Sequence, residues 1–178
     1  MDFKNEPISN INWVDARNLQ ANDYNPNVVL NPEMQLLEFS ILKQGWIQPI
    51  LISEDNIIID GFHRYWISTN STKVVEKYNF MIPVVILKLT EVERMLLTIR
   101  INRAKGNHIA FKMHEIIYKL IKKYNIPVKT IAEEIGANKK EIDLLAKKDV
   151  FEVLDIENHK YSKAWVPKRK FDDEYFKN

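Results

Sequence analysis

The sequence predicts an α/β (α+β) fold, with a small mixed-sheet domain followed by an all-helical domain. Short β-branched runs bounded by turn residues alternate with helical patterns in the first part of the chain. In the second part, apolar residues recur only at helical spacing, and two helices are joined by a glycine turn. We expect four segments: a flexible N-terminus (1–12), an α/β domain (13–100), a helical domain with a helix-turn-helix (101–150) and a C-terminal tail (151–178).

The α/β part opens with turn chemistry and continues through a helix into two strands. Residues 14–19 fit a short strand or turn, and the Asn- and Pro-rich segment 22–27 predicts a loop. Asn31 and Pro32 predict a helix start, as cap and first residue, and Gly45 predicts its end. The apolar runs at 47–52 and 56–59 predict two short strands.

The remaining elements follow from periodicity and capping residues. A short helix is expected over 64–68, leading into a polar stretch, and a buried strand over 81–87. Thr90 with Glu93 forms a capping-box pattern that predicts the start of the next helix. Helical spacing predicts a helix over 111–124 and the glycine-joined helix pair over 126–145.

Composition limits the classes of protein and of site. The chain of 178 residues is 46% hydrophobic and 28% charged, which is ordinary for a soluble globular protein. It has no apolar run of about 20 residues, so we expect no membrane partner. The absence of cysteine excludes disulfides and thiolate metal sites and is consistent with a cytoplasmic location. A net charge of +2 is too small for a global attraction to nucleic acid, so DNA contact requires a local patch.

The most informative segment is 57–66, in which a β-branched run ends at Asp60-Gly61 and a helical pattern carrying His63 and Arg64 follows. The N–H groups at a helix start attract anions, and an arginine can bind phosphate with two parallel hydrogen bonds. Gly61 allows a ligand to approach the backbone closely. This pattern predicts a phosphate site, and it fits a glycine turn with a surface arginine equally well.

The order of these features, from about Trp13 to Lys148, resembles the ParB/sulfiredoxin-like superfamily. The similarity is carried by four segments: the Asn-Pro loop at 22–27, the helix-glycine-strand segment at 37–50 with its Gln-Pro pair, Asp60–Arg64, and Ile101-Asn102-Arg103. The resemblance implies binding of ATP or CTP with Mg²⁺. It places phosphate contacts at Gly61, His63 and Arg64 and a second nucleotide segment at Asn102, Arg103, Lys105, Asn107 and His108.

Departures from the family pattern limit which of the family's activities are expected of this chain. ParB proteins that act as CTP-driven clamps usually have two adjacent arginines after the glycine, whereas this chain has His63-Arg64. That form is more similar to sulfiredoxin and to free-serine kinases. Sulfiredoxin chemistry requires a cysteine in this motif, and because the chain has no cysteine, that activity is excluded. The segment 102–108 resembles short ParB-like proteins of phages and mobile elements. The kinase branch implies an acidic general base, for which Glu38 is a candidate, although Glu38 fits a surface charge better.

Three further candidates depend on local chemistry. Asp60, at the end of a predicted strand, fits a Mg²⁺ ligand or a helix-capping acid. Together with Asp60 and Glu38, His63 is a candidate catalytic residue. His108 fits a proton shuttle near neutral pH, and a solvated linker over the whole basic segment is the alternative.

The helix pair predicts a weak DNA-binding surface. Asn138, Lys139 and Lys140 lie at the start of its second helix, where recognition helices meet the groove. Glu141 and Asp143 oppose the phosphate backbone, so we expect weak binding unless the protein forms a homodimer. The alternative is that the pair is a plain packing unit.

The function expected from these observations is a ParB-like nucleotide-binding protein that acts on or near DNA and binds or hydrolyses ATP or CTP with Mg²⁺. One alternative is an ATP- or ADP-dependent phosphotransferase acting on a small molecule or nucleic acid. A second is a non-catalytic DNA-binding regulator whose pocket is vestigial.

Overall fold

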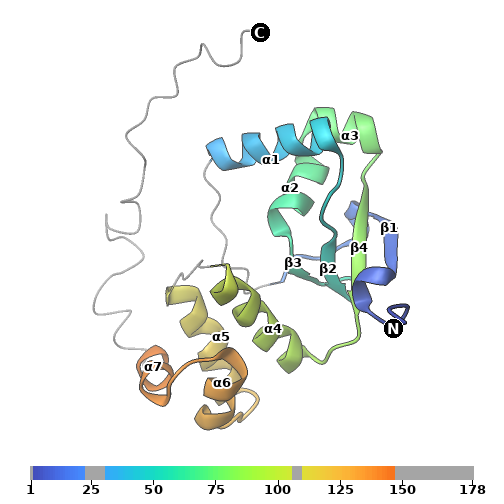
Figure 1. The fold of residues 1–178 in the computed structure, drawn as a ribbon. Coiled ribbons are helices and arrows are strands. Elements are labelled where there is room, and N and C mark those ends of the chain that lie inside the picture. Colours follow the sequence, from blue (N-terminus) through green and yellow to red (C-terminus); the bar gives the residue numbers. More distant parts are fainter. Residues whose placement is uncertain (1, 23–30, 106–109, 147–178) are drawn as a thin grey trace.

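The computed structural model describes residues 2–22, 31–105 and 110–146, and it confirms the α+β architecture (Figure 1). The strands are β1 (Ile11–Asp15), β2 (Ile50–Ser53), β3 (Ile58–Asp60) and β4 (Met81–Leu87). The α-helices are α1 (Asn31–Gln44), α2 (Phe62–Asn70), α3 (Thr72–Tyr78), α4 (Glu91–Ala104), α5 (Ala110–Lys122), α6 (Val128–Ile135) and α7 (Lys139–Leu145). Two short 3₁₀ helices, η1 (Pro7–Ser9) and η2 (Ala16–Asn18), flank β1.

The sheet is mixed, with strand order β1-β4-β2-β3. Strands β2 and β4 run parallel, whereas β1 pairs with β4, and β2 with β3, in antiparallel fashion. One cluster of buried residues joins strands β2, β3 and β4 to η2 and the residue that follows it: Ala16, Leu19, Ile50, Ile52, Ile58, Ile82 and Val84. Helices α1, α2 and α3 pack together through Ile41, Ile67 and Val74.

Several predicted bounds shift. Strand β1 begins at Ile11, inside the segment expected to be flexible. Strand β2 begins at Ile50 and not at residue 47, because Pro49 has no N–H to donate and its carbonyl is bound by a side chain. The polar stretch after residue 68 contains α3, which was not predicted, and the Ser71 hydroxyl caps it by accepting from the Val74 N–H.

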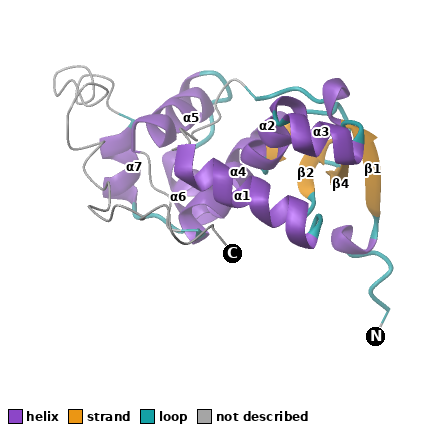
Figure 2. Cartoon of the chain, turned by 90° about the horizontal axis from the view of Figure 1, so that it is seen from above, coloured by secondary structure: helices purple, strands orange, loops and turns teal. Residues whose placement is uncertain are grey.

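Helix α4 crosses the expected domain boundary. Its capping box at Thr90 and Glu93 is confirmed, and the helix continues through the boundary expected at residue 100 as far as Ala104. Its buried residues Met95, Leu96 and Ile99 belong to the same core as Ile117 of α5 and the buried residues of α6 and α7. In both ribbon views α4 lies between the sheet and helices α5 and α6 (Figures 1 and 2). The two parts of the chain therefore share this helix.

The glycine-joined helix pair is present as α6 and α7. Gly136 adopts a left-handed conformation with φ +66° and ends α6. The Asn138 side chain then caps α7 by accepting from the Glu141 N–H at 2.9 Å. Across the described residues, the helices are all too short or too polar to span a membrane.

Candidate functional site

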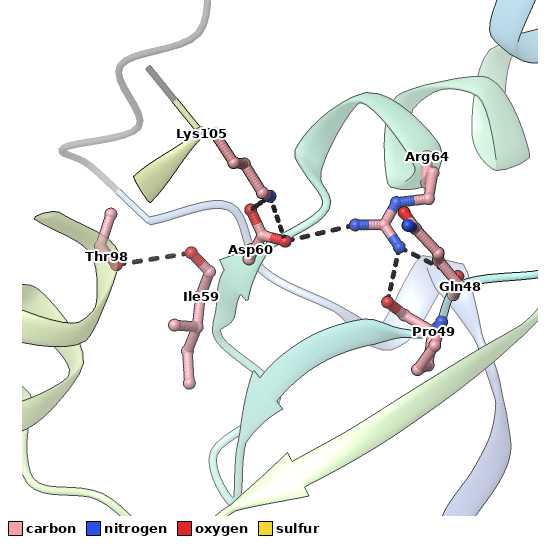
Figure 3. Close-up of polar contacts among 7 residues, drawn as sticks. All are labelled: Gln48, Pro49, Ile59, Asp60, Arg64, Thr98 and Lys105. Carbon is pink, nitrogen blue, oxygen red and sulfur yellow. Dashed lines mark hydrogen bonds and ion pairs between the residues drawn. The ribbon is translucent and has the colours of Figure 1, made fainter. Parts of the chain in front are cut away.

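Charged groups from two distant segments converge where β3 ends and α2 begins (Figure 3). Lys105, at the C-terminal end of α4, lies 45 positions beyond Asp60, and its Nζ is 2.7 Å from Asp60 Oδ1. Arg64 on α2 donates from Nη2 to the other Asp60 oxygen at 3.3 Å. One carboxylate thus holds a cation from each of the two segments that were expected to bind nucleotide.

Arg64 already uses much of its guanidinium within the protein. Nη1 donates to the carbonyl oxygens of Gln48 at 3.0 Å and Pro49 at 2.6 Å, and Nη2 donates to Asp60 (Figure 3). Burial lowers the pKa of Arg64, and the nearby Asp60 carboxylate opposes that shift. Arg64 therefore joins the start of β2 to the end of β3. Three of its five donors are occupied, so a two-pronged phosphate grip requires rearrangement.

Lys105 is the more available of the two cations. Its side chain is 48% exposed, whereas that of Arg64 is 12% exposed. Exposed ion pairs exchange partners at little cost, because solvent screens them and a lysine is a compact point charge on a flexible stem. Lys105 can leave Asp60 for an incoming anion without breaking backbone contacts.

Gly61 makes the close packing at this turn possible. It has φ +98°, which side chains with a Cβ rarely adopt, and it precedes α2 without a side-chain cap. An added Cβ would lie 3.0 Å from Arg64 Nη2 and 3.1 Å from a side-chain carbon of Ile50. Gly61 is therefore required for the position of Arg64 as well as for the turn.

His63, the second residue of α2, is in an unusual environment. Its Nε2 is buried and has no hydrogen-bond partner in the part of the chain that the structure describes. Burial lowers the pKa of His63, and the carboxylates of Glu33 and Asp60 oppose this shift only in part. The lowered pKa favours the neutral imidazole at pH 7, and Nε2 is the ring nitrogen without a partner among the described residues.

This lowered pKa predicts a pH dependence of stability. The unfolded chain binds a proton at His63 below about pH 6.5, whereas the folded chain resists it. The contribution of neutral His63 to the free energy of unfolding is therefore fully present above the pKa of the unfolded chain. It is lost as the pH falls through the lower pKa of the folded chain. We expect the fall in Tm between about pH 7.5 and about pH 5.5 to be smaller in His63→Asn than in wild type. Parallel Tm curves for the two proteins would contradict the assignment.

The second predicted segment is divided by the structure. Asn102 and Arg103 lie in the last turn of α4 and not in a solvated linker, because no glycine or proline occurs between Thr90 and Gly106. Arg103 donates to Glu141 Oε1 at 2.6 Å and to the Gly136 carbonyl, and so contacts the turn between α6 and α7. Lys105 alone of these is seen to contact Asp60, whereas Asn107 and His108 lie outside the described residues.

Glu38 is placed in a different contact. Its carboxylate accepts a hydrogen bond from the Ser71 hydroxyl and links α1 to the start of α3. Besides Asp60, the acid that acts on His63 is Glu33, in the first turn of α1, which the sequence did not mark as a site residue. Neither the Glu33–His63 proximity nor the carbonyl contacts of Arg64 have a local sequence signal, since both depend on how distant segments pack.

The site supplies one carboxylate for a cation. Among the described residues, no group of three or more His, Asp or Glu side chains is arranged to hold a metal ion. Protein-bound Mg²⁺ commonly uses only one or two carboxylates and completes its coordination with water and substrate phosphates. Asp60 fits that arrangement and does not fit a metal site made of protein ligands alone.

Two acidic residues of the helix pair, Glu134 and Glu141, form ion pairs with α4. Arg103 pairs with Glu141, and Arg100 pairs with Glu134 at 3.0 Å. The Lys139 and Lys140 side chains at the start of α7 are exposed, as is the capping residue Asn138. The exposed face of α7 is thus less acidic than its sequence indicates, although Asp143 remains exposed.

Comparison with known proteins gives one close relative and several similar structures. No protein-family model matches the chain. The "Uncharacterized protein YbdM" of Escherichia coli (strain K12) is 35% identical over 170 residues, which cover 93% of this chain and 80% of that protein.

Two solved structures of C-terminally truncated ParB, a chromosome-partitioning protein from Caulobacter crescentus, are similar. One, complexed to the centromeric parS site, has a TM-score of 0.50 and 16% identity and covers 82% of this chain and 78% of that one. The other, complexed with CTP-gamma-S, has a TM-score of 0.44 and 17% identity, with 86% and 88% coverage.

Proposed function

Since this chain belongs to the family of Escherichia coli YbdM and has a ParB-like fold, we propose that it is a nucleotide-binding protein acting on or near DNA. The contact between Lys105 and Asp60 carries the proposal. Two basic segments that are far apart in sequence supply a cation each to one carboxylate, beside an uncapped helix start. Converging cations and helix N–H groups of this kind suit a polyphosphate.

In the proposed complex, a phosphate of ATP or CTP replaces Asp60 as the partner of Lys105. The first N–H groups of α2 also face the phosphate, and Gly61 lets it approach. Asp60 is then free to bind Mg²⁺, which would neutralise phosphate charge. Arg64 keeps the turn in place through the carbonyls of Gln48 and Pro49, and its remaining donors are the ones available for phosphate.

A binding screen tests this proposal directly. ATP, ADP, CTP and GTP are titrated calorimetrically with and without Mg²⁺, and the products are then analysed. Binding of at least one triphosphate supports the site. Hydrolysis without an acceptor indicates a nucleotide switch, and stable binding without turnover indicates an enzyme that awaits a second substrate. If none of the nucleotides binds, the proposed site is wrong.

We place the DNA contact at the start of α7. The double change Lys139→Glu and Lys140→Glu is expected to weaken DNA binding and to make its salt dependence shallower by about 0.9 per lost phosphate contact. Gel shifts at low and moderate salt measure both effects. The charge-matched control is Lys73→Glu with Lys88→Glu, two exposed positions in the α/β part. Equal loss in both double variants would mean that only net charge matters.

A phosphotransferase is the second candidate function, and His63 favours it. A neutral imidazole with an unused, buried nitrogen beside a proposed phosphate site has the protonation state of a general base. Transfer of labelled phosphate from ATP to an acceptor hydroxyl, lost in His63→Asn with nucleotide binding retained, would support this activity over a switch.

A further inference from the structure

Arg94, on the second turn of α4, is a buried cation away from the Asp60 site. It is 8% exposed, and it precedes Lys105 by eleven positions, which is roughly 16 Å along a helix. Between them, Thr98 lies against β3, with its hydroxyl oxygen 3.4 Å from the Ile59 carbonyl oxygen (Figure 3) and 2.9 Å from the Arg94 carbonyl oxygen within α4. Arg94 and Lys105 thus lie near opposite ends of β3.

Arg94 is poorly satisfied by the fold. Its Nη1 reaches the Ser53 hydroxyl oxygen at 3.5 Å, the upper limit of a hydrogen bond, and its buried Nε has no partner among the described residues. None of the ion pairs formed within residues 2–22, 31–105 and 110–146 includes Arg94. A largely buried charge without a charged partner is costly, and such groups in native structures often mark a functional site.

The hydroxyl hydrogen of Ser53, next to Arg94, also lacks an acceptor among the described residues. Ser53 is 1% exposed, and its oxygen accepts from the Ile57 N–H at 3.2 Å as well as from Arg94. No described residue accepts its hydroxyl hydrogen. The two neighbouring buried side chains therefore offer only unused donors, the guanidinium N–H groups and the hydroxyl O–H.

The topology independently marks this position. Ser53 is the last residue of β2, and β2 runs parallel to β4, which ends beside it at Leu87. In open, mostly parallel α/β sheets, ligands bind outside the carboxyl ends of the strands, and β2 with β4 is the parallel pair of this mixed sheet. Asp60 lies at the other end of β3, opposite Leu51 in the sheet register.

We propose that Arg94 and Ser53 form a second binding site, which takes one oxyanion group, a phosphate or a carboxylate, of a small molecule. The oxyanion accepts from the guanidinium and the hydroxyl and supplies the negative charge that Arg94 lacks. Two oxygens of a carboxylate or a phosphate match the N–H groups of a guanidinium, and the buried setting strengthens each contact. The site is independent of the proposed nucleotide site.

Thermal unfolding of the full chain tests this site, with inorganic phosphate and acetate as probes against chloride at fixed ionic strength. In chloride, Arg94→Met is expected to unfold at a higher Tm than wild type, because an apolar side chain replaces an unpaired buried charge. Wild type should gain Tm with a probe anion, and Arg94→Met should lose that gain. A response to phosphate alone, or to acetate alone, identifies the group.

Two variants separate the alternatives. Lys105→Gln should keep the anion response, because it alters only the proposed nucleotide site, whereas Ser53→Ala should reduce it. The proposal is overturned if neither anion raises the Tm of wild type above its value in chloride. It is also overturned if Ser53→Ala and Arg94→Met respond like wild type, in which case Arg94 is a structural residue. If Arg94→Met does not fold, Ser53→Ala alone decides between these outcomes.

Discussion

Replacing Arg64 with alanine is expected to destabilise the fold by about 3 kcal/mol, the largest effect on stability that we predict. The change removes three hydrogen bonds and leaves the carbonyls of Gln48 and Pro49 without their donor. Arg64→Lys should recover little, because one ammonium group cannot reproduce a planar fork. Urea unfolding of the three proteins measures the difference as a shift of the midpoint at constant slope.

Arg17 provides the matched control for Arg64. It also binds an aspartate, Asp15, through two guanidinium nitrogens, but its side chain is 61% exposed. Arg17→Ala should leave the unfolding midpoint close to that of wild type, since solvent screens such pairs. If Arg64→Ala and Arg17→Ala behave alike, Arg64 does not hold the turn, and its main role must lie in ligand binding.

Lys105→Gln is expected to lower nucleotide affinity by about 1.5–3 kcal/mol, or roughly 10- to 150-fold, the usual worth of a hydrogen bond to a charged group. The effect of Lys105→Gln on stability should be small, because solvent screens the Lys105 side chain, which is 48% exposed. Calorimetric titration and urea unfolding of the same variant measure both quantities. The two variants should thus differ in which quantity they change. Arg64→Ala should mainly lower the free energy of unfolding, whereas Lys105→Gln should mainly lower nucleotide affinity.

The control for Lys105 is Lys73→Gln, which removes an exposed lysine from α3. It should bind nucleotide like wild type. If Lys105→Gln also binds like wild type, the pair with Asp60 is only structural, and the phosphate must contact other groups.

The elements with strong local signals were predictable from sequence. The β-branched run at 81–87 is strand β4, and the capping box at Thr90 starts α4 where expected. The left-handed glycines Gly45, Gly61 and Gly136 lie at the turns where the sequence places them. These features depend on a few neighbouring residues, and they can therefore be predicted from sequence without knowing the tertiary contacts.

The site was only partly predictable, because its partners come from packing. The sequence indicated Asp60, Arg64 and Lys105 as chemically able groups, and the structure brings them together. It gave no sign that Arg103 would contact Glu141, since α4 and α7 meet only in the folded chain. The sequence likewise could not predict that Arg94 is buried without an ion-pair partner, because the burial of an arginine depends on how distant segments pack.

Helix α4 also limits how this protein can be recombined with its relatives. One side of the helix contributes to the core of α5–α7, while Thr98 and Lys105 contact β3 and Asp60. A chimera joined near residue 100 would cut this helix and pair each half with foreign surfaces. An exchangeable module has to begin in the segment between β4 and Thr90, and it brings Arg94 and Lys105 with it. Evolution by domain exchange would then transfer half of each anion site together with the helix pair.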